Sequence, residues 1–263
     1  MTSHPSDDMP VAESWFGIDE ADENGVRRIR ELHVHDYGGG NIWLVEGRER
    51  CLLVETGLGV MPLRAFVETV TDKPVVAFAS LGYYDHAGGL HQFDARLIHR
   101  ADVHRVAAPT RRNTAAERYL GDAFRALPYA GFDPATYVMP ASEPTRPLDD
   151  GDIVDLGGRR FEVLHLPGVT AGASGLFERA TGVFFSGEAL IWDQDYVYDG
   201  EPADVSDDAD RTAFRHSLAR MAALPATVVY PGHFGRSDAS DMRRAIGNYL
   251  AGRNVASAPH GYA

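Results

Sequence analysis

The stretch Ala79-Ser-Leu-Gly-Tyr-Tyr-Asp-His-Ala-Gly-Gly89 follows an apolar run at residues 74–78 and ends in a pair of glycines. A short apolar run bounded by turn residues predicts a buried strand, and polar side chains at a strand end can converge on a site. Asp85 and His86 are of the residue types that bind metal ions. Leu81 and Tyr83, however, stand where such a loop would carry further imidazoles. The stretch therefore predicts a loop at a strand end with an incomplete set of metal ligands.

Two further short motifs follow strand-like segments in the same way. Ser186-Gly-Glu188 comes after the apolar residues 183–185, and Pro231-Gly-His233 comes after residues 228–230. Each motif puts a potential ligand where a strand ends and a loop begins. Rigid strand ends let ligands from distant parts of a chain converge on one cleft. We therefore expect these two motifs to lie beside the Asp85-His86 pair.

The spacing of apolar and turn residues predicts two β-rich halves, each ending in helices. In the first half we expect strands at residues 28–35, 41–46, 51–55, 96–99 and from 73 into the opening stretch, with helices at 63–70 and 101–107. In the second half we expect strands at 151–154, 159–165, 174–178, 183–185 and 227–230, with helices at 211–223 and 239–250. The halves predict two packed sheets with helices outside, in a single domain over residues 1–263.

Two segments interrupt this pattern. Residues 108–147 are rich in Pro, Gly, Arg and aromatic residues around one expected helix at 114–126, and we interpret them as a cap or inserted loop. Residues 192–210 are acidic with scattered aromatic residues, and we interpret them as an active-site loop. Both segments are expected to shape the pocket that receives the substrate.

Three more short motifs occur along the chain: Asn41-Ile-Trp-Leu-Val45, Glu55-Thr-Gly-Leu-Gly59 and His165-Leu-Pro-Gly-Val-Thr170. Together with the motifs above, their order resembles the metallo-β-lactamase fold superfamily, particularly its glyoxalase II-like hydrolases. The resemblance covers about residues 29–235. It implies an α+β fold, an αββα four-layer sandwich, with a metal centre along one edge of the two sheets.

The resemblance also assigns the candidate ligands. The first family motif, His-x-His-x-Asp-His, falls on Leu81, Tyr83, Asp85 and His86, so its two leading histidines are absent. The family's histidine after Pro-Gly falls on Val169, its bridging aspartate on Glu188 and its last histidine on His233. The replaced positions, Leu81, Tyr83 and Val169, belong to the first metal site of the family, and the retained set Asp85, His86, His233 and Glu188 to the second.

Leucine and valine have no lone pairs to donate, so the imidazole site of the first metal cannot form. Two imidazoles with one or two carboxylates are a ligand set for Zn²⁺, Fe²⁺ or Mn²⁺. We therefore predict a mononuclear centre that holds one divalent transition metal. Glu55 stands where the family has an aspartate that supports the ligands. One hypothesis is that Glu55 and Glu188 reach into the space left by the missing histidines.

The expected function is hydrolysis of a small ester, thioester, lactone or amide. The family's chemistry assigns Asp85 to orient the attacking water, Glu188 as a fourth ligand or base, and Tyr83 as the acid, although Tyr83 can equally be a wall residue. One alternative is redox, lyase or decarboxylase chemistry on the same fold. Another is a catalytically silent descendant that binds a small molecule or a protein.

Other histidines and arginines have simpler interpretations. His33-Val-His35 also matches the opening of an amidohydrolase-type barrel, but the repeated strand-helix alternation of such a barrel is absent. These two histidines are expected to border the cleft instead. Packed or solvated positions are expected for His91, His99, His104 and His216. Arg111-Arg112 is either a solvated pair or a contact for an anionic substrate.

Composition excludes some partners. The net charge of −13 and the pI near 5.2 oppose a nucleic-acid backbone or an anionic membrane as the main partner. The single cysteine, Cys51, excludes an internal disulfide, and it is expected to be buried in a strand. The polar, acidic start of the chain does not resemble a secretory signal, and no apolar run reaches the roughly 20 residues that span a bilayer. A cytoplasmic protein that acts on a small-molecule substrate is expected.

Overall fold

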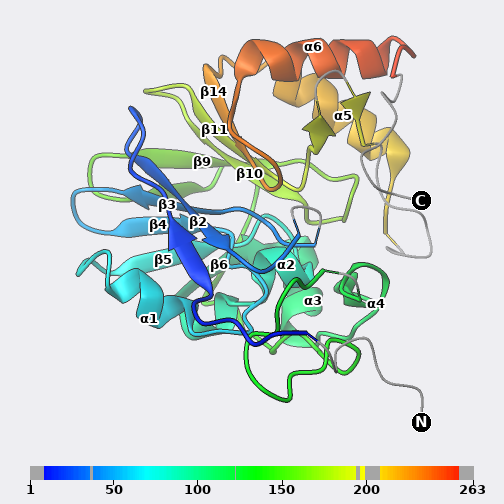
Figure 1. The fold of residues 1–263 in the computed structure, drawn as a ribbon. Helices are drawn as coiled ribbons and strands as arrows, with labels where there is room; N and C mark the ends of the chain where they lie inside the picture. The colour runs from blue at the N-terminus through cyan, green and yellow to red at the C-terminus, as the bar shows by residue number, and fades with distance from the viewer. Residues whose placement is uncertain (1–8, 36–37, 122, 194–195, 199–207, 255–263) are drawn as a thin grey trace.

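Two large sheets pack face to face, with helices on both outer sides (Figure 1). The computed structural model describes residues 9–35, 38–121, 123–193, 196–198 and 208–254. Two long helices cover one sheet, and the short helices lie beyond the other. The predicted αββα sandwich is confirmed. The α-helices are α1 (Leu63–Glu68), α2 (Tyr84–Ala87), α3 (Val103–Ala107), α4 (Ala116–Tyr119), α5 (Arg211–Ala222) and α6 (Ala239–Leu250), and two 3₁₀ turns are η2 (Leu90–Gln92) and η3 (Arg100–Asp102).

The first sheet has seven strands in chain order. They are β1 (Phe16–Ile18), β2 (Val26–Glu31), β3 (Ile42–Glu46), β4 (Cys51–Val54), β5 (Val75–Phe78), β6 (Ala95–His99) and β7 (Arg146–Leu148). The first four strands pair antiparallel, whereas β4, β5, β6 and β7 run parallel to one another. Since parallel strands end at the same edge of a sheet, the loops after β4 and β5 emerge side by side.

The second sheet has six strands in the order β15-β14-β11-β10-β9-β8. Their bounds are β8 (Ile153–Asp155), β9 (Arg160–His165), β10 (Ser174–Glu178), β11 (Val183–Gly187), β14 (Val228–Pro231) and β15 (Ser237–Asp238). Strands β11 and β14 are parallel, so the loops that follow them also emerge side by side. A small separate hairpin is formed by β12 (Trp192–Asp193) and β13 (Tyr196–Val197).

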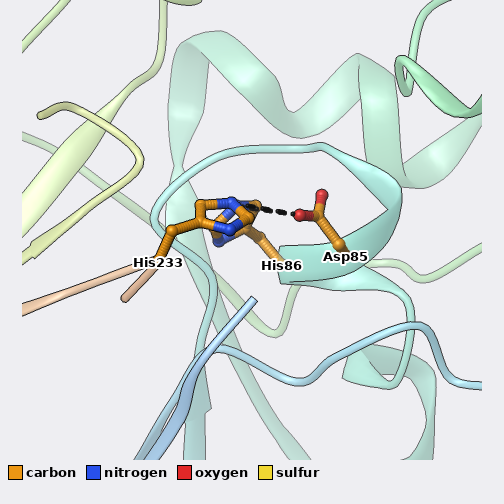
Figure 2. Close-up of side chains that lie close together, drawn as sticks. All are labelled: Asp85, His86 and His233. Atoms are coloured by element: carbon orange, nitrogen blue, oxygen red, sulfur yellow. Dashed lines mark ion pairs between the residues drawn. The ribbon is translucent and has the colours of Figure 1, made fainter. Parts of the chain in front are cut away.

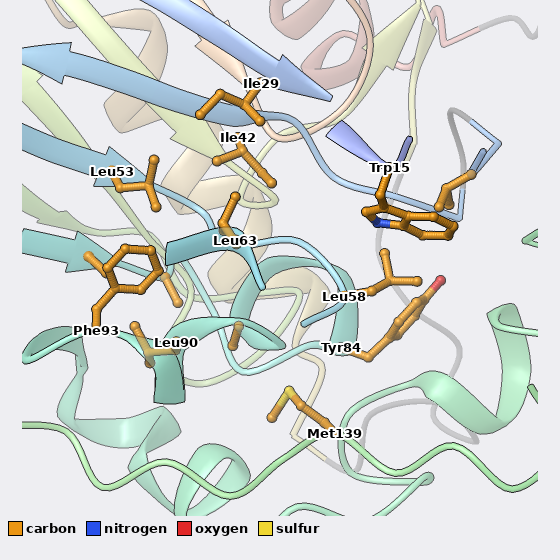
Figure 3. Packing of buried hydrophobic residues seen from close by; sticks show 14 of the residues in the cluster. Trp15, Ile29, Ile42, Leu53, Leu58, Leu63, Tyr84, Leu90, Phe93 and Met139 are labelled. Atoms are coloured by element: carbon orange, nitrogen blue, oxygen red, sulfur yellow. The ribbon is translucent and has the colours of Figure 1, made fainter. Parts of the chain in front are cut away.

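The central strands are apolar without interruption because both of their faces are buried. In β4, Leu52 and Val54 face the space between the sheets, whereas Cys51 and Leu53 face the helices outside. Figure 3 shows that outer cluster, where Leu53 packs near residues of the short helices such as Leu63 and Leu90. The continuous apolar run that predicted a strand thus serves two cores, one on each side of the sheet.

Most of the predicted elements are present, with ends that agree with the predicted ones or differ from them by up to four residues. The predicted helix at 114–126 is wrong, because only α4 forms there. After α4 the chain uses its backbone groups in pairing with distant segments. Arg125 N donates to His33 O, and Leu127 N donates to Pro10 O, so these groups are not available for a helical ladder. The edge strands β1, β7 and β15 were missed, since each has only two or three residues.

The two segments that were expected to be a cap and a loop, residues 108–147 and 192–210, differ in structure. Within residues 108–147, apolar side chains such as Leu120, Phe132 and Met139 join the outer cluster of the first sheet, and Tyr137 Oη donates to Leu58 O at 2.6 Å. The hairpin β12–β13 occupies the start of the predicted loop 192–210, while residues 194–195 and 199–207 lie outside the described part. Among the described residues, no helix combines the length and apolar character needed to cross a bilayer.

Candidate metal centre

The three ligand-bearing motifs meet at one edge of the sandwich, as their positions after strands predicted. The loop after β5 leads into α2, which carries Asp85 and His86, and the loop after β14 carries His233. Figure 2 shows the carboxylate of Asp85 turned towards the two imidazole rings. The loop after β11 brings Glu188 to the same place. All four residues are buried.

Close backbone contacts fix the Asp85-His86 turn in place. Thr56 donates from both its backbone nitrogen and its hydroxyl to His86 O, at 2.8 and 2.9 Å. A Cβ atom on Gly88 would lie 2.3 Å from the carbonyl of Leu58, so only glycine allows the turn to approach this loop. The paired glycines after Asp85-His86 are therefore explained by packing against the loop that follows β4.

The His233 loop is held by side chains from β3 and the residue before it. Asn41 donates from Nδ2 to the carbonyl oxygens of Pro231 and Phe234, at 2.9 and 2.8 Å. Trp43 Nε1 donates to the same Pro231 oxygen at 2.9 Å. A Cβ atom on Gly232 would lie 2.8 Å from Cε1 of His86, which makes this glycine necessary where the two ligand loops touch. These bonds give the Asn41 motif a positioning role.

The donor atoms of the centre have the spacing of metal ligands. One donor atom each from Asp85, His86 and His233 lies within 4.8 Å of the others. Asp85 Oδ2 is 3.5 Å from Nε2 of His86 and 3.3 Å from Nε2 of His233. Glu188 Oε2 is 3.2 and 3.1 Å from the same two nitrogens. A tetrahedral ion with bonds of about 2.0–2.1 Å separates its ligand atoms by roughly 3.3 Å, so these N···O spacings fit.

These atoms also lack the hydrogen bonds that would explain their burial otherwise. Among the described residues, Nε2 of His86 and Oε2 of Glu188 are buried and have no protein hydrogen-bond partner of acceptable geometry. Leaving buried polar atoms unsatisfied costs about 1–3 kcal/mol each. A cation among them would remove this cost, so both the residues and their arrangement fit a bound metal ion.

Glu55 contacts the cluster from behind. Its Oε1 is 3.3 Å from Nδ1 of His86, the ring nitrogen opposite the one that faces Asp85 and Glu188, and its Oε2 accepts from Ser80 N at 3.0 Å. The backbone of Glu55 has a φ of 66°, a left-handed conformation that is unusual for this residue type. A carboxylate beside Nδ1 orients the imidazole and favours the tautomer whose Nε2 can bind a metal. Both carboxylates thus lie against the ligand histidines, Glu55 beside Nδ1 of His86 and Glu188 beside Nε2 of His86 and of His233.

The metal-free cluster holds protons that a metal ion must displace. Burial would lower the pKa of His233, but the carboxylates of Glu188 and Asp85 outweigh burial and raise the pKa to about 10. Burial would also lower the pKa of His86, but the carboxylates of Asp85 and Glu55 outweigh burial. The pKa of His86 therefore lies well above its usual value. Burial would raise the pKa of Glu188, yet the two imidazoles lower it to about 2. Metal binding at neutral pH should therefore release protons.

The metal-free protein is expected to lose stability as the pH rises from 6.5 towards about 10. The folded pKa of His233 is raised from 6.5, so its stabilisation is complete below pH 6.5 and is lost as the pH rises through the folded pKa. Thermal unfolding in the presence of a chelator, at several pH values, measures this. The variant His233→Gln should show a shallower fall, because His86, whose pKa is also raised, still contributes. A melting temperature of the chelated wild type that does not fall in this window would contradict the assignment.

The positions of the missing first site are filled by an apolar cluster. Leu81, Tyr83 and Val169 are all buried and belong to the same cluster, which continues under α5 and α6. The guanidinium of Arg105 lies 5.7 Å from the centre of the Tyr83 ring. The three positions at which the family pattern predicts histidines are thus occupied by buried members of one apolar cluster.

A buried acid that sequence reasoning missed joins the loops of the missing site. Asp102, fully buried, accepts from Gly82 N and Thr170 Oγ1 through Oδ2, at 2.9 and 2.8 Å, and from Gly172 N through Oδ1 at 2.9 Å. Its partners are 20, 68 and 70 residues away in the chain. No local pattern marks such a residue, because each of its bonds is made by the fold.

The other histidines and arginines considered as site residues lie outside the metal centre, and they contact other groups of the protein. His165 stacks on His99 with ring centres 4.0 Å apart, and its Nε2 lies 2.8 Å from Ala171 O. Arg111 donates to the carbonyl oxygens of Pro134 and Tyr137. His35 accepts from Arg125 at 3.3 Å, so it borders a neighbouring pocket and not the metal centre. Cys51 is a free, buried strand residue, as predicted.

Known proteins with similar sequences are hydrolases by name. The chain is 30% identical over 244 residues to the acyl-coenzyme A thioesterase MBLAC2 of Bos taurus. The aligned region covers 87% of this chain and 85% of that protein. It is 29% identical over 198 residues to the hydroxyacylglutathione hydrolase of Pseudomonas aeruginosa (strain LESB58), which covers 73% of this chain and 60% of that enzyme.

Solved structures share the fold at lower sequence identity. The metallo-beta-lactamase from Pontibacter korlensis superposes with a TM-score of 0.62 and 18% identity, over 88% of this chain and 97% of that one. A metallo-beta-lactamase family protein from Thermus thermophilus superposes with a TM-score of 0.61 and 24% identity, over 81% and 74%. Residues 35–233 match the model of the Metallo-beta-lactamase superfamily. The chain belongs to the metallo-beta-lactamase superfamily.

Proposed function

We propose that the protein is a metal-dependent thioesterase with one divalent transition metal ion, held by Asp85, His86 and His233. The observation that supports this most is the convergence of two imidazole nitrogens and two carboxylate oxygens at ligand spacing in a buried site. Nitrogen and oxygen donors of this kind suit Zn²⁺ or Fe²⁺, and also Mn²⁺. When bound, the ion would act as a Lewis acid that polarises the substrate carbonyl and lowers the pKa of water.

The apolar first site favours a thioester over an oxygen ester or an amide. A second ion could stabilise the leaving group, but Leu81 and Val169 offer it no ligands. A thiol has a pKa near 8.5, so a thiolate leaves near neutral pH without that help. An alkoxide or an amine anion would need much more assistance. A thiolate leaving group therefore suits a centre with ligands for a single metal ion.

The names of the relatives point to the same substrate class. One is an acyl-coenzyme A thioesterase and the other a hydroxyacylglutathione hydrolase, so each name describes an acyl group on a thiol carrier. The proposal extends this class to the present chain, as a protein that acts on a small acyl thioester in the cytoplasm. Residues 108–147 would cover the substrate as a cap.

Glu188 is proposed to take the proton from the attacking water, with Asp85 orienting that water. Catalytic zinc sites keep one position open beside three protein ligands, and Asp85, His86 and His233 already provide three. The two imidazoles keep the Glu188 carboxylate ionised, and its Oε2 lies 3.1 and 3.2 Å from Nε2 of His233 and of His86, so it is placed beside the candidate centre with lone pairs that can accept a proton. Tyr83 is the candidate proton donor, although a thiolate needs little protonation, so Tyr83→Phe should have a small effect.

Metal analysis followed by a matched substrate panel tests the proposal. Protein loaded with one equivalent of Zn²⁺ or Fe²⁺ should hydrolyse an acyl thioester faster than the oxygen ester, lactone or amide of the same acyl group. Glu188→Gln should retain the ion and lower kcat at least about 10²-fold if Glu188 is the base. Loss of the ion in this variant would make Glu188 a ligand instead.

The other outcomes identify the alternative functions. Loaded protein that hydrolyses no member of the panel contradicts the thioesterase function. If that inactive protein holds iron, redox, lyase or decarboxylase chemistry becomes the better account. A protein that binds no transition metal at all would be a catalytically silent member of the fold that binds a small molecule or a protein.

A further inference from the structure

A basic pocket lies next to the metal centre, and nothing described above accounts for it. Its volume is about 110 Å³, and it is lined by β2, the residues that follow β2, the start of β3 and the chain after α4. The side chains that give it its character are Arg28, Arg30, His35 and Arg125. In a chain with a net charge of −13, three arginines lining one small pocket are a local concentration of basic side chains.

The pocket and the metal centre share a wall. Gly40 and Asn41 line the pocket. A Cβ atom on Gly40 would lie 2.9 Å from Asp85 O and 3.3 Å from Cε1 of His86, so the backbone of Gly40 packs directly on the two ligands. Asn41, in turn, holds the His233 loop through Pro231 O and Phe234 O. The pocket and the two ligands therefore lie on either side of the same short stretch of backbone.

Two of the pocket's arginines, Arg30 and Arg125, are exposed and can offer charge to a ligand. Arg30 pairs with Asp19 at 2.6 Å, in an exposed contact that solvent screens. Arg125 is exposed, and in the described part of the chain its guanidinium contacts Nδ1 of His35 without an ion pair to a carboxylate. Arg28 lies over the Trp43 ring at 5.9 Å.

Glu31, the one acid among the described residues of the lining, has its oxygens occupied. Glu31 Oε1 accepts from Trp15 Nε1 at 2.9 Å, and Glu31 Oε2 accepts from Leu58 N at 3.0 Å. Burial raises the pKa of Glu31 to about 7, so this acid is only partly ionised at neutral pH. As far as the described residues line it, the pocket therefore presents guanidinium donors beside an acid whose oxygens are already bonded.

We propose that this pocket binds the anionic end of the thiol half of the substrate, and this inference rests on the thioesterase function proposed above. Guanidinium groups bind phosphate and carboxylate through paired hydrogen bonds, and both groups occur on thiol carriers. The phosphates of a coenzyme A thioester and the carboxylates of a glutathione thioester share this chemistry. The acyl group would then lie on the other side of the metal centre from Gly40.

The variant Arg125→Ala tests the pocket. The side chain of Arg125 is exposed. Its backbone nitrogen donates to His33 O, and the substitution leaves this hydrogen bond in place. The variant should therefore fold normally. Arg50→Ala is the matched control, since Arg50 lies before β4, at the opposite end of that strand from the metal centre. Three acetyl thioesters serve as substrates: acetyl coenzyme A, S-acetylglutathione and the neutral S-acetyl-N-acetylcysteamine.

In Arg125→Ala we expect kcat/KM for one anionic thioester to fall on the order of tenfold relative to the neutral thioester, mainly through KM. The affected substrate identifies the carrier, with phosphates if it is acetyl coenzyme A and carboxylates if it is S-acetylglutathione. Added salt should reduce the advantage of the anionic substrate in the wild type. An equal change for all three substrates, or the same change in Arg50→Ala, would overturn the proposal.

Direct binding separates this proposal from the proposed function. Calorimetry with 3′-phosphoadenosine 5′-diphosphate and with S-methylglutathione uses the anionic parts without a free thiol, so neither probe needs catalysis. If the wild type hydrolyses no thioester but binds one probe, and Arg125→Ala loses that binding while Arg50→Ala keeps it, the pocket stands and the thioesterase function fails. Equal binding of both probes to wild type and Arg125→Ala, or no binding to either, refutes the pocket.

Discussion

Replacing His86 with alanine is expected to remove the metal ion and to lower kcat/KM at least about 10³-fold. The imidazole of His86 lies between Asp85 and Glu188 on one side and Glu55 on the other, so it connects the ion to its supporting carboxylate. A Lewis acid supplies several kcal/mol of transition-state stabilisation, and each 1.36 kcal/mol corresponds to a factor of ten in rate. Metal content by mass spectrometry and steady-state kinetics on an acyl thioester measure both effects.

The controls separate loss of the ion from loss of the fold. His104→Ala removes an exposed imidazole whose Nδ1 lies 3.0 Å from Ala101 O, so metal content and activity should be those of the wild type. His86→Gln keeps a polar side chain of similar reach, and its circular dichroism should match the wild type while its metal content falls. A folded His86→Ala protein with full metal content and full activity would disprove the ligand assignment.

Replacing Asp102 with alanine is expected to destabilise the fold by about 3–5 kcal/mol, the range for breaking a buried ionic contact. Asp102 accepts three hydrogen bonds from Gly82, Thr170 and Gly172, and Arg105 lies beside it at 3.7 Å. The variant leaves those donors unpaired in a site from which water is excluded. One of the two loops joined by Asp102 contains Leu81 and Tyr83 and the other contains Val169, so this residue cross-links two segments that are far apart in the chain.

Chemical denaturation of Asp102→Ala beside Asp149→Ala measures this effect. Asp149 pairs with Arg100 at 2.6 Å, but both side chains are more than half exposed, and exposed pairs contribute about 0–1 kcal/mol. The difference between the two variants should therefore be several-fold in free energy of unfolding. Similar losses in both variants would show that Asp102 does not hold the loops together.

The layers of the fold follow from local sequence patterns. Apolar runs such as 51–54 and 183–185 are bounded by turn residues, and they became strands with both faces buried. Charged and apolar residues at helical spacing gave α6 with the predicted bounds of 239–250, because its apolar face packs on the second sheet. Patterns of this length carry enough information because each element buries its own side chains.

Features that depend on distant partners could not be predicted in this way. Residues 120–127 have helical composition, but Ala123 O accepts from His35 N and Arg125 N donates to His33 O, so pairing with another segment replaced the helix. The same limit applies to the metal centre. Asp85, His86, Glu188 and His233 were selected by motif order, whereas the support from Asn41 and Asp102 depends on contacts that only the folded chain creates.

Titration of metal-free protein with Zn²⁺, followed by calorimetry, tests the central claim most directly. The account predicts one ion per chain, bound with the release of protons from His86 and His233, because Leu81, Tyr83 and Val169 leave no ligands for a second ion. Two ions per chain, or no binding at any concentration that the protein tolerates, would contradict it.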